Sequence, residues 1–390
     1  MYRSNIIRED KERDSNIKLG TIHLIGLYLS FGLTSFNTHQ LFIVPPTILF
    51  FILSLPFFVL AVIKNSLLIE HYKTYSFLVA AFLYLMLTQL AIGAPFARSV
   101  GFYISILYFP LTAFFAKHLS LKSIVSVINF FIRSSILIFI FELIFRITNP
   151  DLTYEQFNFG QDVRWIYKYK FSSILYADSN GTGIHLVIVF FFILYWSSKI
   201  KKRFRIEKLI ILLLIFLSFS RASWAATFLG IFFFPTINSN NNLNKLLFVC
   251  AAFFIVSLSL IVVSPVLSND LSLISKIGLI DKLNTYIEDA TIMDIIFGIG
   301  FSNSLSLLGY YPHSYFIVLL MESGILGLFF MLTMFLGIFL NAGSRILIIL
   351  IPFFVVTLSA TITFMPFFYA VLGIIFILET NYRQIPKSSL

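Results

Sequence analysis

Long apolar segments follow one another along almost the whole chain, and short polar segments separate them. A helix needs about 20 mostly apolar residues to cross a bilayer, and many of these segments approach that length. Of the 390 residues, 58% are hydrophobic and 12% are charged, whereas an average soluble domain has roughly 25% charged residues. The sequence therefore predicts an all-α, polytopic membrane protein.

About twelve transmembrane helices are expected. Their segments are 19–36, 41–63, 75–93, 100–116, 124–147, 183–198, 209–220, 222–237, 246–267, 314–340, 346–360 and 364–379. The short pairs that meet at Arg221 and at 361–365 could each form one bent helix. The expected organisation is a tail at 1–18, five helices within 19–147, a loop at 148–182, helices within 183–267, a loop at 268–312, helices within 313–379 and a tail at 380–390.

The basic residues predict the orientation. With the N-terminus in the cytoplasm, nineteen of the 28 Lys and Arg residues fall on the cytoplasmic side and eight fall outside. This asymmetry favours cytoplasmic termini and places both long loops outside. The net charge of +10 is then explained by topology and by anionic lipid rather than by nucleic acid.

Several kinds of chemistry find no support in the sequence. Cys250 is the only cysteine, so an internal disulfide is excluded and a cysteine metal site is not expected. No HExxH, Walker A or GxSxG motif occurs, and no metal or other cofactor is predicted. Arg133 and Glu142 lie nine residues apart in one helix and so on opposite faces. We expect Arg133 to be buried against other helices, and Glu142 to lie near the outer end with Arg146.

The first polar motif is residues 218–223, Ser-Phe-Ser-Arg-Ala-Ser. An unpaired charge within a bilayer costs about 2.5 to 3.5 kcal/mol on insertion scales, so Arg221 is expected at the interface or paired. A guanidinium offers a planar fork of donors that suits phosphate oxygens, and Ser220 adds a hydroxyl. We interpret Arg221 as an anion-binding residue held between two apolar segments, with a snorkelling arginine at a helix end as the alternative.

The second motif is residues 178–183, Asp-Ser-Asn-Gly-Thr-Gly, followed by His185. Short polar residues and glycines at this position are typical of a capped helix start, whose backbone N–H groups can also hold an anion or a sugar hydroxyl. Asn180 is therefore a candidate for substrate binding, although capping alone explains most of the pattern. His185 is expected to be a structural hydrogen-bonding residue.

The third motif joins the second loop to the segment 314–340. Gly298 and Gly300 suit a turn, and His313-Ser314 stand where this segment begins, eleven residues before Gly324. A histidine can accept a proton near neutral pH, and at this boundary it can meet a lipid-borne substrate and an aqueous one together. A helix cap or interface residue is the alternative for a lone histidine.

Together these motifs resemble the O-antigen polymerases and O-antigen ligases, which act on undecaprenyl diphosphate-linked glycans. The resemblance covers about residues 176–328. It rests on Ser220-Arg221, on Asn180-Gly181, and on His313-Ser314 with Gly324 and Gly327. That family often has a further arginine in the outer loop before the histidine, where this chain offers only Lys276 and Lys282.

The resemblance implies a metal-independent glycosyltransferase at the periplasmic face of a bacterial inner membrane. It implies that Arg221, helped by Lys276 or Lys282, holds the diphosphate of the donor. His313 would orient or deprotonate the acceptor hydroxyl. Ser220, Asn180, Ser314 and Tyr311 are the other expected substrate-binding residues. Membrane lipid, a chain-length regulator and a flippase are the expected partners.

Several functions remain open at this point. A polymerase would use another lipid-linked repeat unit as acceptor, and a ligase would use lipid A-core. The absent loop arginine favours a polymerase. A lipid-linked glycan flippase or transporter would need cations lining a cavity in the first five helices, where the sequence offers Arg133 and Arg98. A membrane scaffold would leave the outer cations without a role.

Overall fold

The computed structural model describes residues 19–38, 41–42, 44–64, 72–92, 96–152, 168–170, 172–176, 178–238, 271–308, 314–358, 360, 362 and 364–382. In this part of the chain the structure is helical and has no strand. The helices are η1 (Tyr28–Gly32), α2 (Pro46–Lys64), α3 (Tyr72–Ala91), α4 (Phe96–Lys117), α5 (Leu121–Thr148), α7 (Ser179–Ile200), α8 (Arg205–Leu217), α9 (Arg221–Asn238), α11 (Leu271–Asp289), α12 (Ile292–Phe297), α13 (Ser304–Leu308), α14 (Tyr315–Ala342), η3 (Ser344–Ile346), α15 (Leu347–Thr357) and α16 (Pro366–Thr380).

Five of the described helices are long and apolar enough to cross a membrane: Pro46–Ile63, Val100–Lys117, Leu121–Thr148, Ser179–Ile200 and Tyr315–Ala342. Shorter apolar helices occupy Leu19–Gly32, Phe82–Ala91, Ser344–Thr357 and Pro366–Thr380. This set is compatible with a multi-pass membrane protein. The expected helix at 246–267 lies outside the described residues, and the count of twelve stays a prediction.

Helices α7 and α16 form the centre of the bundle. Every residue of α16 up to Glu379 is buried, and the helix packs most extensively on α4. Gly373 permits that approach, because a Cβ at this position would lie 2.7 Å from the carbonyl oxygen of Phe109. Large apolar side chains instead remain exposed on α2, α5, α8 and α14, among them Ile63, Leu137, Leu209 and Phe329. Those outer faces suit contact with lipid chains.

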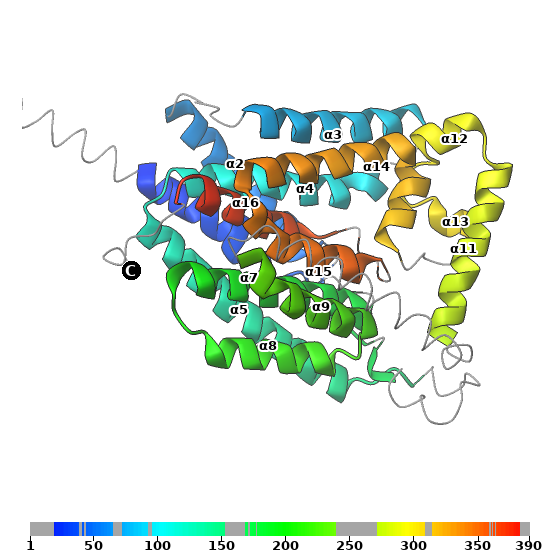
Figure 1. Ribbon diagram of the computed structural model, residues 1–390. Coiled ribbons are helices and arrows are strands. Elements are labelled where there is room, and N and C mark those ends of the chain that lie inside the picture. Colours follow the sequence, from blue (N-terminus) through cyan, green and yellow to red (C-terminus); the bar gives the residue numbers. More distant parts are fainter. Residues whose placement is uncertain are drawn as a thin grey trace, which may run out of the picture.

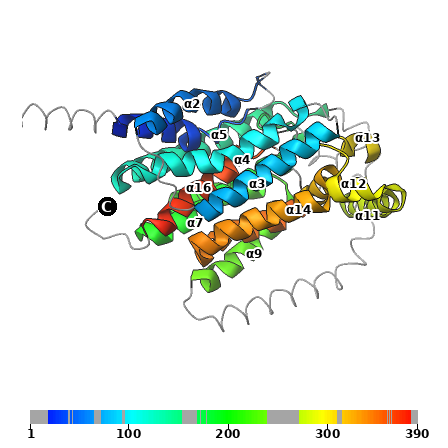
Figure 2. The ribbon, with the colours of Figure 1, turned by 90° about the horizontal axis from the view of Figure 1, so that it is seen from above.

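The two ends of the bundle differ. Figures 1 and 2 place α11, α12 and α13 together at one end, beside the first part of α14. The connection between α7 and α8 lies at the opposite end (Figure 1). It carries the basic residues Lys201, Lys202 and Arg203. The fold thus separates the segment expected outside from the basic segment expected in the cytoplasm.

Three details differ from the sequence-based expectations. Arg133 has an exposed side chain and is not buried against other helices. The first expected loop ends earlier than residue 182, because α7 begins at Ser179. The second expected loop, 268–312, contains the helices α11, α12 and α13.

The long helix α14 is broken at Gly324, whose φ of 69° lies in the left-handed region that favours glycine. A Cβ there would collide with the backbone of Ile296 at the end of α12. The turn after α12 pairs with the carbonyls next to this break, since Ile299 N donates to Met321 O (2.9 Å) and Gly300 N donates to Glu322 O (3.1 Å). The break therefore joins α12 to α14 by backbone hydrogen bonds, which satisfy polar groups that a buried non-helical segment would otherwise leave unpaired.

Candidate functional site

The start of α7 is a capped helix N-terminus, as its sequence suggested. Asp178 accepts hydrogen bonds from the backbone N–H groups of Asn180 (3.0 Å) and Gly181 (3.1 Å). The side-chain amide of Asn180 donates to the other carboxylate oxygen of Asp178 (2.6 Å). Asn180 is half-buried. Its observed contact is therefore part of the cap, and a role in substrate binding stays a prediction.

The motif at 218–223 forms a tight turn between α8 and α9. Phe219 has a φ of 55°. The hydroxyl of Ser220 accepts hydrogen bonds from the backbone N–H of Ser223 (3.4 Å) and from its hydroxyl (2.9 Å). Arg221 is the first residue of α9, and its side chain is exposed. Arg221 thus lies between the apolar helices α8 and α9, as its sequence predicted, and the turn at Ser220 leaves its side chain exposed. A role in anion binding stays a prediction.

The two motifs meet in space. A Cβ on Gly183, in the first turn of α7, would collide with the hydroxyl of Ser223 and would lie 2.9 Å from Cβ of Ser220. The start of α7 and the start of α9 are therefore in direct contact, and glycine is needed at this crossing. The two helix N-termini therefore meet beside Arg221, with the N–H groups of Asn180 and Gly181 already bonded to Asp178 and that of Ser223 bonded to Ser220.

A buried ion pair on α5, Glu142 with Arg146, holds these elements together. Glu142 accepts hydrogen bonds from Ile174 N (2.9 Å) and from the hydroxyl of Thr182 (3.3 Å). Arg146 Nε lies 3.5 Å from Glu142 Oε1. Its Nη2 donates to the carbonyl of Leu217 (3.1 Å) at the end of α8. The expected neighbourhood of Glu142 and Arg146 is confirmed, and the structure adds that the pair ties α5 to the starts of both motifs.

His185 is buried, with no measurable exposure. Its Nδ1 lies 2.9 Å from the hydroxyl of Tyr176, and its Nε2 lies 3.4 Å from the hydroxyl of Ser35. Its ring stacks on that of Phe367 with centroids 3.6 Å apart. His185 is thus the structural hydrogen-bonding residue that its position predicted.

The beginning of α14 is only partly described. Ser314 is buried and precedes the first turn, where its carbonyl accepts from Val318 N (3.0 Å). Tyr311 and His313 lie outside the described residues, so the expected base has no position here. The first two residues of α14 contact α15 through their rings: Tyr315 meets Phe353, and Phe316 meets Phe354. Because α15 also packs extensively on α9, it connects the start of α14 to the helix that Arg221 begins.

A buried carboxylate supports the break in α14. Glu322 is 1% exposed, and one of its oxygens accepts a hydrogen bond from the hydroxyl of Ser304. Gln89 of α3 bridges the same region, since its side-chain oxygen accepts from Phe301 N. Glu322 therefore anchors α13 rather than facing an open site.

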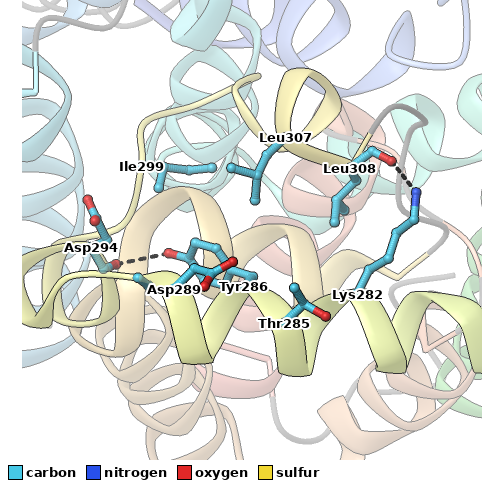
Figure 3. Close-up of a pocket in the computed structure, with 9 residues that line it drawn as sticks. Lys282, Thr285, Tyr286, Asp289, Asp294, Ile299, Leu307 and Leu308 are labelled. Atoms are coloured by element: carbon cyan, nitrogen blue, oxygen red, sulfur yellow. Dashed lines mark hydrogen bonds between the residues drawn. The ribbon is translucent and has the colours of Figure 1, made fainter.

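The two lysines expected to assist Arg221 both lie on α11. Lys276 belongs to the helix, but its side chain is outside the described structure. The amine of Lys282 donates a hydrogen bond to the carbonyl of Leu308, at the end of α13 (Figure 3). This contact places Lys282 at the edge of a cavity of about 420 Å³ between α11, α12 and α13. The role of either lysine in diphosphate binding stays a prediction.

Tyr286 forms part of the same cavity and is not a candidate base. Burial, together with the negative charge of Asp294, raises its pKa. The phenol therefore stays protonated at neutral pH, and it donates to the backbone carbonyl of Asp294 (3.3 Å). Among the described residues, no three His, Cys, Asp or Glu side chains are grouped so that they could hold a metal ion.

Comparison with known proteins identifies no family. No family model matches this chain, and no curated protein matches it.

Proposed function

We propose that this chain is an O-antigen polymerase, which joins oligosaccharide repeat units carried on undecaprenyl diphosphate at the periplasmic face of a bacterial inner membrane. An acceptor hydroxyl attacks the anomeric carbon of the donor glycan, and the bond from that carbon to the diphosphate breaks. Arg221 holds the diphosphate, with Lys276 and Lys282 as further cations. His313 takes the proton of the hydroxyl, a role for which a positioned base contributes about 10²- to 10⁴-fold.

The observation that carries this proposal is the contact between the starts of α7 and α9. Gly183 lies against Ser220 and Ser223, so two helix N-termini converge next to an exposed arginine. A guanidinium fork favours phosphate oxygens, whereas the N–H groups of Asn180, Gly181 and Ser223 already donate to Asp178 and to Ser220. A diphosphate leaving group needs such stabilisation as its bond breaks.

The arrangement of the bundle supports the proposed orientation. The basic connection between α7 and α8 lies at the opposite end from α11, α12 and α13 (Figure 1). With the basic end in the cytoplasm, α11 to α13 stand in the periplasm. A chain-length regulator and a flippase are proposed as partners because the resemblance to the O-antigen polymerases implies them.

A flippase or transporter is less well supported. It would carry cations on helix faces that line a central cavity, but the side chain of Arg133 is exposed on α5. Arg98 belongs to α4, and its side chain is outside the described structure. A ligase, which would use lipid A-core as acceptor, is the alternative that the surface glycan of a deletion strain distinguishes from a polymerase.

Arg221 is the residue to test. If its planar fork grips the diphosphate, Arg221→Lys should lose most polymerisation although the charge is kept, and Arg221→Ala should lose more. Arg205→Ala is the matched control, because Arg205 is also an exposed arginine that begins a helix, α8. The readout is the length distribution of surface glycan on gels, with protein abundance measured in the same cells. Normal glycan from a stable Arg221→Ala protein would remove this residue from the mechanism.

A further inference from the structure

The cavity between α11, α12 and α13 has the size of a small-ligand site. Its volume is about 420 Å³, within the range of roughly 300 to 1,000 Å³ typical of ligand pockets. Figure 3 shows its two ends. Lys282 reaches Leu308 at one end, and Asp289, Asp294 and Tyr286 gather at the other.

The acidic end offers acceptors for hydroxyl groups. Asp294 helps to cap the start of α12. Its Oδ2 accepts hydrogen bonds from Thr291 N (3.1 Å) and from the hydroxyl of Thr291 (2.7 Å). Within the described residues Oδ1 accepts no hydrogen bond, and Asp289 has an exposed carboxylate without a partner. Ile299 and Leu307 add apolar surface facing these groups (Figure 3). Polar acceptors beside apolar walls suit a molecule that has both hydroxyl groups and C–H faces.

Packing and hydrogen bonds within the protein hold part of the cavity wall in place. Tyr286 and Leu308 belong to a small hydrophobic cluster that includes Met321 of α14. The backbone of Ile299 is bonded to Met321, and Lys282 ties α11 to the end of α13. A preformed site of this kind loses little ordering entropy on binding.

The cavity is also close to the proposed base along the chain. Leu308 lines it, and His313 follows five residues later. Five residues span at most about 18 Å when fully extended. An acceptor glycan of several sugar residues can cover a distance of this order.

We propose that this cavity binds a sugar residue of the acceptor glycan, an inference that rests on the proposed polymerase function. The carboxylates of Asp289 and Asp294 accept hydrogen bonds from sugar hydroxyls. Two carboxylates would repel the diphosphate, so this end takes the sugar and leaves the phosphates to the site at Arg221. The polymerase then selects its acceptor through the acidic end of this cavity and binds its leaving group through Arg221, with Lys276 and Lys282 of α11 as further cations.

The test measures binding of the repeat-unit oligosaccharide, released by mild acid from the lipid carrier of a strain that lacks this chain. The full-length protein in lipid nanodiscs is titrated with it by calorimetry. Asp289→Ala should weaken binding about tenfold or more, because it removes a hydrogen bond to a charged group. Leu307→Trp should weaken binding by filling the cavity. Each has a matched control on the same helix whose residue does not line the cavity, Glu288→Ala on α11 and Leu305→Trp on α13.

Enzyme kinetics with the lipid-linked unit provide the second readout. The cavity variants should raise KM while kcat at saturation stays close to the control value. Cavity variants that bind and polymerise like their controls, or no saturable binding to the unaltered protein, would overturn the cavity assignment while leaving the polymerase intact. A strain that keeps its normal glycan after losing the chain would overturn the polymerase, and the cavity assignment with it.

Discussion

Removing Arg146 should separate the elements that build the site. Its side chain is 2% exposed and connects three parts of the chain: Glu142 on its own helix, the carbonyl of Leu217 at the end of α8, and the carbonyl of Tyr169. Arg146→Leu keeps the apolar stem and deletes these contacts. Glu142, itself 1% exposed, then loses its cationic partner.

The magnitude follows from the burial of both partners. Breaking a buried pair by removing one member costs about 3 to 5 kcal/mol, because the remaining charge is left uncompensated. Replacing both members by well-packed apolar residues of similar volume is often close to neutral. Glu142→Gln combined with Arg146→Leu removes both buried charges and keeps an amide oxygen as an acceptor beside Ile174 N, so it should recover much of the stability. The double variant should still polymerise poorly, since the carbonyl of Leu217 next to the 218–220 turn remains without its donor.

Arg133→Leu is the control, because Arg133 is an arginine on the same helix with an exposed side chain. Thermal unfolding of the purified proteins in detergent gives the stability, and the glycan ladder gives the activity. We expect a large fall in the unfolding midpoint for Arg146→Leu and little change for Arg133→Leu. Equal midpoints for the two single variants would refute the argument that the Glu142 and Arg146 pair organises this end of the bundle.

Two other predictions concern packing and orientation. Gly183→Ala should disrupt the contact of α7 with Ser223 and reduce both protein abundance and glycan length. Gly278→Ala on α11 is the control and should be tolerated, because an added Cβ there meets no atom within 4 Å. Equal effects of the two substitutions would contradict this prediction. A reporter that is active only outside the cytoplasm should work when fused within 271–308 and fail within 199–208, and activity at Lys202 would reverse the orientation.

The hydropathy of the sequence predicted where most helices lie, but not which face of each helix is buried. The expected segments at 124–147 and 222–237 correspond closely to α5 and α9. The side chain of Arg133 was misplaced because apolar residues surround α5 on every side, so the sequence does not distinguish its buried face. Helices α11 to α13 were missed because their mixed polar composition resembles that of a loop when only membrane spans are sought.

The candidate site was predicted as separate motifs, and the structure shows which of them meet. Nothing in the spacing of Gly183 and Ser223, forty residues apart, indicates that they touch. The break at Gly324 was also not foreseen, because Gly324 stands in an apolar run that reads as one continuous helix. Its cause is the backbone of Ile296, a contact that becomes visible only in three dimensions.

The surface glycan of a strain that lacks this chain is the most direct test of the polymerase proposal. We expect the core to carry a single repeat unit, and the unaltered gene to restore full-length glycan. His313→Ala should fail to restore it while the protein reaches normal abundance, because we expect a histidine at the membrane interface to serve chemistry rather than the packing of apolar helices. Bare core with accumulated lipid-linked polymer would identify a ligase instead, and an unchanged ladder would contradict both.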